Sequence, residues 1–338
     1  MLIDLRSDTV TRPTPAMLKF MFNAKVGDDV FKEDPSINEL EKKAAAMFGK
    51  EAGIYCPSGT MTNQTAIKVH TQPGDELLCD VTAHVYNYEG GGIAFNSGVQ
   101  TKLIPGDNGR FTAKQLEQAL HPYADWLPNT SLVTIENTSN RGGGAYYQIK
   151  NVKEISQVCK KNKLALHMDG ARIFNALAET GESPKEYGKT CDSVSICLSK
   201  GLGAPVGSVL LGSNEFVAKA RRIRKLLGGG MRQGGYLAAA GIYALENNIK
   251  RLKEDHQRAR RIADILTTKS YVTNMLPVAT NIIIFSLDKT MTSEKFTGEL
   301  KKNNILVSSI GSNALRIVTH LDFNDTMLKT VEKTLKKL

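Results

Sequence analysis

The sequence predicts an α/β fold in which a mostly parallel, seven-stranded sheet lies between helices and is followed by a small C-terminal α+β domain. Short apolar, β-branched runs alternate with amphipathic stretches through the first two thirds of the chain, and this order changes near residue 246. Strands that alternate with helices form parallel sheets. A chain of 338 residues also exceeds what one core usually holds, which favours a large domain over residues 1–246 and a small one over 247–338.

Seven runs in the first part have the composition of buried strands, with helical segments between them. The expected strands are 53–56, 76–80, 102–104, 131–135, 164–169, 193–198 and 207–212. The expected helices include 37–48, 60–70, 114–119, 152–161 and 215–225. Ligands of such sheets bind at the carboxyl ends of the strands, so functional residues are expected at that edge.

The last third of the chain has a different order of elements. Residues 232–268 are expected to form one or two long helices. The expected elements after them are a strand at 281–286, a helix at 293–303, strands at 305–308 and 314–318, and a final helix from Asp325. This order predicts the small α+β domain.

Charge and hydropathy argue against several classes of protein. The net charge is +10, but the basic residues are spread out, and the densest cluster, residues 221–225, has no interleaved aromatic side chains on which bases could stack. Nucleic-acid binding is therefore not expected. No run of about 18 apolar residues exists, which argues against a membrane span. The N-terminus carries charges where a signal peptide needs an apolar stretch, so a cytoplasmic location is expected.

The cysteines and histidines do not have the spacing of metal ligands. The five cysteines are odd in number and include no C-x-x-C pair, and the six histidines include no H-x-x-x-H pair. Neither a metal site nor a disulfide framework is expected.

The first motif with chemical meaning is Leu164-Ala-Leu-His-Met-Asp169-Gly-Ala-Arg172, in which an apolar strand ends at a carboxylate. Asp169 could be only the cap of a following helix. A carboxylate at this edge of the sheet also suits a cation, such as a protonated pyridine nitrogen whose charge lets the ring accept electrons.

The second motif is Ser195-Ile-Cys-Leu-Ser199-Lys200-Gly-Leu-Gly203, in which a neighbouring strand ends at a lysine. Lys200 could be an ordinary exposed lysine at a strand end. The glycines that follow it leave room for a flat ligand, and a neutral amine attacks aldehydes.

The third motif, Pro57-Ser58-Gly59-Thr60, opens a helix after a strand, and free N–H groups there suit a phosphate. A routine helix cap would have the same residues. Together, a phosphate turn, an aldehyde-binding lysine and a carboxylate for a ring nitrogen are the three features needed to bind pyridoxal phosphate.

The chain resembles the fold-type-I, aspartate-aminotransferase-like pyridoxal-phosphate enzymes and, more closely, the low-specificity L-threonine aldolases. The matching segments span nearly the whole chain and are residues 4–13, 26–30, 164–176, 197–207, 228–233 and 317–322. The resemblance implies that residues 1–246 bind pyridoxal phosphate. It also implies retro-aldol cleavage of L-threonine, L-allo-threonine and other β-hydroxy-α-amino acids to glycine and an aldehyde.

The resemblance implies a role for each matching residue at the cofactor. Lys200 would carry it as a Schiff base, Asp169 would pair with the ring nitrogen, and His84 would stack on the ring. His84 is also the candidate base. The remaining cofactor contacts implied are Ser58, Gly59, Thr60, Arg172, Ser199, Lys225 and Arg232. Lys225 and Arg232 would come from a neighbouring subunit, which implies a homo-oligomer, a dimer of dimers, with shared active sites.

The substrate would be bound by Ser7, Arg172 and Arg316, with the arginines holding its carboxylate. Without the resemblance, His84 would be taken for a polar core residue and Arg316 for a surface arginine. Two positions depart from the family pattern. Trp126 stands where many relatives have a histidine that contacts the substrate, and Ser139 replaces another histidine. Both affect the expected preference between threonine and allo-threonine.

Two other functions remain open at this point. Another pyridoxal-phosphate reaction on the same fold, β-elimination or transamination, would release a keto acid instead of acetaldehyde. A non-catalytic sensor on this scaffold usually carries a fused DNA-binding domain, for which the family-like segments leave no room.

Overall fold

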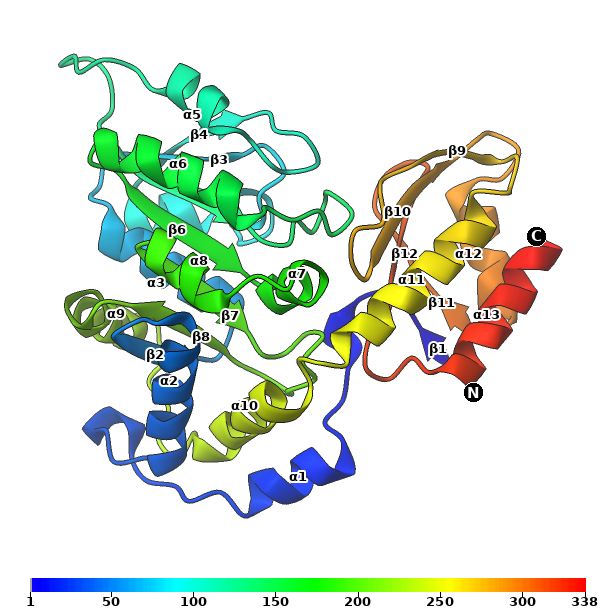
Figure 1. Ribbon diagram of the computed structural model, residues 1–338, viewed down its shortest axis with the longest axis horizontal. Helices are drawn as coiled ribbons and strands as arrows, with labels where there is room; N and C mark the ends of the chain where they lie inside the picture. The colour runs from blue at the N-terminus through cyan, green and yellow to red at the C-terminus, as the bar shows by residue number, and fades with distance from the viewer. Residues whose placement is uncertain (1) are drawn as a thin grey trace.

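The computed structural model describes residues 2–338, and its main feature is a seven-stranded sheet in the order β2-β8-β7-β6-β5-β3-β4 (Figure 1). Every pair in it is parallel except that β8 runs antiparallel to both of its neighbours. This confirms the predicted mostly parallel, seven-stranded sheet. The strands are β2 (Ala52–Cys56), β3 (Glu76–Asp80), β4 (Gln100–Ile104), β5 (Thr130–Glu136), β6 (Ala165–Gly170), β7 (Ser193–Cys197) and β8 (Ser208–Gly212).

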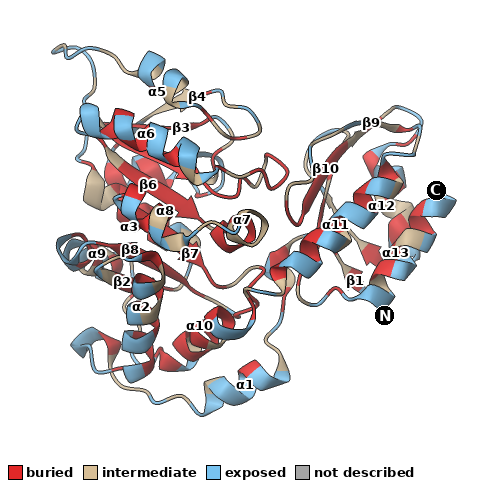
Figure 2. Ribbon diagram, viewed as in Figure 1, coloured by how far each residue is buried: buried red, intermediate tan, exposed pale blue. Residues whose placement is uncertain are grey.

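Helices cover both faces of this sheet, and their sheet-facing sides are buried (Figure 2). One face is covered by α2 (Pro35–Phe48), α5 (Ala113–Ala119), α6 (Ile149–Lys161), α8 (Pro184–Thr190) and α10 (Gly235–Asn247). The other face is covered by α3 (Gly59–His70) and α9 (Asn214–Leu226). The first face holds the larger apolar core, which includes Leu166, Met168, Val194 and Ile196 from the central strands.

The C-terminal part contains a four-stranded antiparallel sheet in the order β12-β13-β10-β9. Its elements are α11 (Leu252–Leu266), β9 (Val272–Met275), β10 (Ile282–Leu287), α12 (Ser293–Lys302), β12 (Ser308–Ser309), β13 (Ala314–Val318) and α13 (Asp325–Lys337). The predicted small α+β unit is confirmed, but β9 was not predicted because its Val-Thr-Asn-Met sequence is not an apolar run. The boundary at residue 247 falls where α10 ends and stays a prediction.

The N-terminal arm joins the two parts. Strand β1 (Ile3–Asp4) pairs in parallel with β11 (Ile305–Leu306) in the C-terminal part, and the chain then returns to the large sheet. The carboxyl ends of β5, β6 and β7 face this arm, with α7 (Ile173–Thr180) beside it (Figure 1). None of the helices in residues 2–338 is long and apolar enough to cross a membrane.

Asp34 is fully buried and connects α2 to the start of α10. Its Oδ1 accepts the Ile37 N–H at 3.0 Å, which caps α2. Its Oδ2 accepts N–H groups from Gly235, at 2.9 Å, and Gly27, at 3.2 Å. One carboxylate therefore joins the start of α2 and the segment before it to Gly235, 201 positions away.

Replacing Asp34 with alanine should lower the free energy of unfolding by about 2–4 kcal/mol, because the cap is lost and the buried Gly235 N–H and the partly buried Gly27 N–H lose their acceptor. Urea unfolding followed by circular dichroism measures this. Asp125→Ala, in an exposed loop, is the control and should change the value by less than about 0.5 kcal/mol. An Asp34→Ala protein as stable as its parent would show that these hydrogen bonds contribute nothing.

Candidate active site

A cavity of about 430 Å³ lies between the carboxyl ends of the large sheet's strands and the C-terminal part. Five of the predicted site residues line it: Ser7, His84, Arg172, Lys200 and Arg316. They come from the N-terminal arm, from the segments after β3, β6 and β7, and from β13. The fold therefore brings together residues that are more than 300 positions apart.

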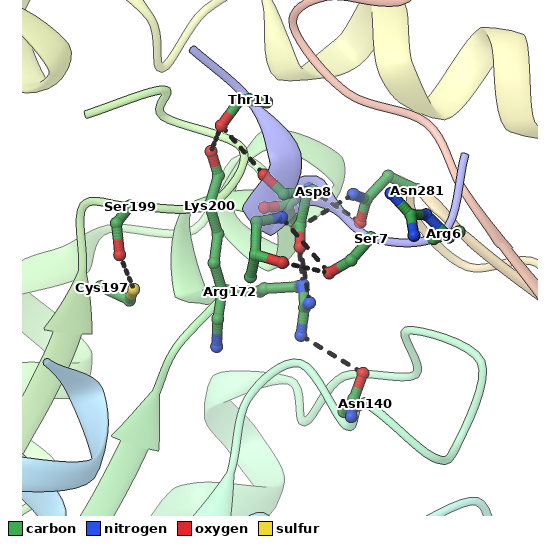
Figure 3. A network of polar contacts seen from close by, with 12 residues as sticks. Arg6, Ser7, Asp8, Thr11, Asn140, Arg172, Cys197, Ser199, Lys200 and Asn281 are labelled. Atoms are coloured by element: carbon green, nitrogen blue, oxygen red, sulfur yellow. Dashed lines mark hydrogen bonds and ion pairs between the residues drawn. The ribbon is translucent and has the colours of Figure 1, made fainter. Parts of the chain in front are cut away.

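Lys200 follows β7 and has no hydrogen-bonded partner for its amine within the part of the chain that the structure describes (Figure 3). Its backbone is fixed: the carbonyl accepts the Thr11 hydroxyl at 3.1 Å and the Gly203 N–H at 2.8 Å. Gly203 has a φ of +78°, and a Cβ there would lie 2.5 Å from the Leu321 side chain, so the turn requires glycine. The lysine amine is held at the cavity and left open to react.

Asp169 ends β6, and its carboxylate belongs to a buried acidic cluster. Asp169, Glu89 and His84 each offer an atom within 4.8 Å of the others. Asn63 Nδ2 donates to both carboxylates, at 2.9 Å each, and the Ala171 N–H donates to Asp169 Oδ1 at 3.1 Å. Such a cluster suits a cation, and a protonated ring nitrogen is one.

His84 lies beside this cluster and donates to it. Burial disfavours the charged imidazole, but the hydrogen bond to Glu89 and the charges of Asp169 and Glu89 outweigh burial and raise the pKa of His84. Nδ1 lies 3.0 Å from the Glu89 carboxylate, which can only accept, so Nδ1 carries the proton of the neutral ring. Nε2 is then the nitrogen with a free lone pair.

Arg172 and Asp8 form a buried ion pair with two hydrogen bonds of 2.7 Å. Burial alone would raise the pKa of Asp8, but the Arg172 guanidinium and the Lys200 amine hold it well below its usual range. The charge of Arg172 is therefore already neutralised by the N-terminal arm (Figure 3).

Arg316, on β13, has donors left to bind an anion. Its Nη1 donates to Asn140 Oδ1 at 2.9 Å and its Nη2 to the Arg6 carbonyl at 3.1 Å. Its buried Nε has no hydrogen-bond partner among residues 2–338. A buried N–H without an acceptor is costly, which suits a site completed by a carboxylate.

The turn before α3 has the features of a phosphate site. Ser58 caps the helix by accepting the Met61 N–H at 3.1 Å, and the first N–H groups, at Gly59 and Thr60, have no intrahelical acceptor. The buried Ser208 hydroxyl beside Gly59 has no hydrogen-bond partner in the described chain. With the open lysine amine and the cation-binding cluster, these groups fit pyridoxal phosphate.

Seven of the predicted cofactor residues do not line this cavity: Ser58, Gly59, Thr60, Asp169, Ser199, Lys225 and Arg232. Ser199 lies next to Lys200, with its hydroxyl 3.5 Å from the Cys197 sulfur. Arg232 is 58% exposed and pairs with Asp28, and Lys225 lies in the last turn of α9. The action of Lys225 and Arg232 in a neighbouring subunit, like the role of Ser199, stays a prediction.

The predicted contact of Trp126 with the substrate stays a prediction, because within one chain Trp126 does not line the cavity. Trp126 is 84% exposed, on the loop that leads into the amino end of β5, whereas the cavity lies at the carboxyl ends. Ser139 is buried and accepts the Gly142 N–H at 3.1 Å, so it holds a turn behind the cavity. Neither departure from the family pattern lies in the wall of the site.

Sequence reasoning did not single out five buried or half-buried residues that shape the site: Asp8, Asn63, Glu89, Glu136 and Asn140. Most of their partners lie far away in the sequence, and no recognisable spacing marks them. Asp8 does lie within residues 4–13, which match the family, and Asn140 follows Ser139, which departs from the family pattern. These positions are the one sequence signal that could have identified the two residues.

Glu136 is fully buried at the end of β5 and supports both sides of the cavity. Its carboxylate accepts the backbone N–H of His84 at 2.9 Å and that of Asn140 at 2.8 Å. Burial, then the negative charge of Asp169, raises its pKa to about 7, although the two N–H groups oppose this rise.

The family model described as beta-eliminating lyase matches residues 4–290. The low specificity L-threonine aldolase of Escherichia coli (strain K12) is 42% identical, over 98% of this chain and 97% of that protein. Low-specificity L-threonine aldolase 1 of Arabidopsis thaliana is 41% identical, over 94% and 91%. The chain belongs to the low-specificity L-threonine aldolase family. It is therefore one of the pyridoxal-phosphate-dependent lyases.

Solved structures agree on the fold of this aldolase family. The Leishmania major threonine aldolase matches with a TM-score of 0.87 and 21% identity, over 99% of each chain. A putative L-allo-threonine aldolase from Listeria monocytogenes matches with a TM-score of 0.82 and 20% identity, over 99% of this chain and 96% of that one. At this identity the likeness establishes the fold alone.

Glu136→Gln should change how stability depends on pH. The pKa of Glu136 is about 7 in the folded chain and 4.5 as an ordinary glutamate. The contribution of this group to the free energy of unfolding is therefore fully present below pH 4.5 and is lost as pH rises to about 7. Glutamine carries no charge, so the stability of the variant relative to the parent should increase between pH 5 and 8, by up to roughly 3 kcal/mol. Thermal unfolding at four pH values tests this, with the exposed Glu117→Gln as control. Parallel curves for parent and Glu136→Gln would contradict the raised pKa.

Proposed function

We propose that this chain cleaves L-threonine and L-allo-threonine to glycine and acetaldehyde, and other β-hydroxy-α-amino acids to glycine and the corresponding aldehyde, with pyridoxal phosphate as cofactor. One observation carries the proposal: the Lys200 amine, which has no described partner, shares a cavity with Arg316, whose buried Nε has none either. The names of the relatives, L-threonine aldolases at 41–42% identity, support the same reaction.

Lys200 would hold the cofactor's aldehyde carbon, Asp169 its ring nitrogen, and Gly59 with Thr60 its phosphate. When bound, the cofactor supplies a protonated ring that accepts the electrons left on the substrate's Cα when the Cα–Cβ bond breaks. Asp169 preserves this property because its carboxylate, fixed by two hydrogen bonds, favours the charged ring nitrogen.

Arg316 and Ser7 would bind the substrate's carboxylate. The guanidinium is already oriented by Asn140 and the Arg6 carbonyl, so little rotational freedom is lost when the anion binds. A fixed carboxylate would set the direction of the Cα–Cβ bond. Arg172, neutralised by Asp8, would contribute mainly by packing and by holding the arm in place.

His84 would take the proton from the substrate's β-hydroxyl. Its Nδ1–H faces Glu89, which leaves the lone pair of Nε2 toward the cavity. The carboxylate behind the ring stabilises the imidazolium that forms, as expected for a general base. The raised pKa of His84 implies that activity falls as pH drops and the ring becomes charged.

A homo-oligomer, a dimer of dimers, would complete each site with Lys225 and Arg232 of a neighbour. Apolar side chains lie exposed on the elements that flank residues 225–232: Phe22, Phe31, Leu226 and Tyr236. Exposed apolar surface of this kind is typical of an interface between subunits. The cytoplasmic location and the absence of a metal stay predictions from the sequence.

The reaction is tested by incubating the cofactor-loaded protein with each threonine isomer and coupling released acetaldehyde to an alcohol dehydrogenase. Acetaldehyde and glycine in equal amounts are expected. Release of a keto acid without acetaldehyde would instead indicate β-elimination or transamination. Lys200→Ala should lose at least about 1,000-fold in rate, because the amine that holds the cofactor is removed. Near-normal cleavage by this variant would refute the role of Lys200.

Arg316→Lys should raise the KM for L-threonine roughly ten- to a hundredfold, because the charge stays but the two-pronged donor set is lost. The variant kcat should change less than KM. Steady-state kinetics measure both, and Arg261→Lys, an exposed arginine paired with Glu332, is the matched control. An unchanged KM would remove Arg316 from the carboxylate site.

A further inference from the structure

Helix α3 is buried against the large sheet through polar side chains rather than apolar ones. Thr62, Asn63, Gln64 and Thr65 are all at most 2% exposed. Burying a polar group costs free energy unless the group finds a hydrogen-bond partner. An apolar interface would avoid that cost. A polar layer at this position therefore calls for a function.

The sheet presents a matching polar face to this helix. On β6, Leu166 and Met168 belong to the apolar core on one side, and His167 and Asp169 alternate with them toward the other side. His167 lies opposite Ser193 of β7 in the register, and all three polar residues are buried. The polar layer thus runs along β6 away from Asp169.

The hydrogen bonds of Asn63 fix the direction of this layer at its active-site end. Its amide nitrogen lies 2.9 Å from carboxylate oxygens of both Asp169 and Glu89, which can only accept hydrogen bonds. The amide oxygen therefore faces His167, whose Nε2 lies 3.1 Å away. That nitrogen must carry a proton to complete the bond.

The remaining bonds carry the same direction to the far end of the layer. Burial, then the nearby His70, lowers the pKa of His167 to about 3, so the ring is neutral and Nδ1 accepts. Ser193 Oγ lies 2.8 Å from this Nδ1 and 2.8 Å from Nε2 of His70. His70 lines a second cavity at the opposite edge of the sheet. Every donor in the series His70, Ser193, His167, Asn63 thus points toward Asp169.

We propose that Asn63 and His167 are positioning residues that hold the Asp169 carboxylate directed at the cofactor's ring nitrogen. Glu89 and Glu136 lie near Asp169 with like charge, and the Asn63 amide supplies an N–H donor to the Asp169 carboxylate. His84 is the other titratable group close to Asp169. The inference rests on the proposed function, because it concerns how the cofactor is held.

Without the Nε2–H of His167, the Asn63 amide oxygen loses its donor, and the amide is held less firmly with its nitrogen toward Asp169. The Asp169 carboxylate is then less firmly directed at the ring nitrogen and favours its charged form less, so the ring accepts electrons less well. The effect would therefore appear at the cofactor, three hydrogen bonds from His167: from His167 to Asn63, from Asn63 to Asp169, and from Asp169 to the ring nitrogen.

The test uses holoenzyme reconstituted with pyridoxal phosphate carrying ¹⁵N in the ring. The NMR shift of this nitrogen distinguishes the protonated from the unprotonated ring. The parent should give the protonated position at pH 8. His167→Phe should move the signal toward the unprotonated position and lower kcat roughly ten- to a hundredfold. His167→Gln, whose amide can donate to Asn63, should restore most of both.

Ser193→Ala provides a second test that removes only one hydroxyl, in case His167→Phe fails to fold. It should shift the signal in the same direction by a smaller amount. His320→Phe is the control. His320 is also buried, but it lies in the C-terminal part, where its Nε2 contacts the carbonyl of Asp4 from the N-terminal arm. Parent-like nitrogen signals in His167→Phe, or in Ser193→Ala if only that variant folds, would overturn the inference. A parent protein that retains no cofactor would instead refute the proposed function.

Discussion

The active site depends on the buried ion pair between Asp8 and Arg172. It fixes the N-terminal arm between the large sheet and the C-terminal part, and from the same arm Thr11 binds the Lys200 carbonyl. It also supplies negative charge where two arginines and a lysine converge, which would otherwise repel one another. Removing either partner would leave an uncompensated buried charge, the most costly change to such a pair. The position of the arm is therefore as much a part of the site as the strand ends.

With Arg172 neutralised, the cavity separates into a basic and an acidic side. Arg316 and Lys200 face the space where a carboxylate and an aldehyde would lie. Asp169, Glu89 and Glu136 lie on the other side, where they stabilise cationic groups, and His84 stands between the two sides. Asn140 joins the two sides. Its side-chain oxygen accepts a hydrogen bond from Arg316, and its backbone N–H donates to Glu136.

The sequence was sufficient for those parts of the fold and site that are encoded locally. An apolar run followed by Asp169 or by Lys200 identifies both a strand and its functional end, and all seven strands of the large sheet were predicted within a few residues. Asp8, Asn63 and Glu89 could not be found in this way. Asp8 contacts Arg172, 164 positions away, and Asn63 contacts His167, 104 positions away, while Glu89 lies in a turn without a recognisable pattern. Trp126 is the opposite case. The resemblance to the family implies a role for it, but its loop leads into the amino end of β5, away from this chain's cavity, so that role stays a prediction.

The polar side of α3 shows why stability alone does not explain this fold. In a helix that serves only to cover a sheet, apolar residues in place of Asn63 and Gln64 would make the folded protein more stable. Here Gln64 binds Glu89 at 2.7 Å, and Asn63 binds Glu89 and Asp169, so both side-chain amides of the helix donate to carboxylates beside the cavity. These amides, together with His84 and the Ala171 N–H, supply donors to both carboxylates. The polar face of the helix therefore buries less apolar surface than an ordinary covering helix would. In return, it supplies the hydrogen bonds that position the Asp169 carboxylate beside the cofactor site.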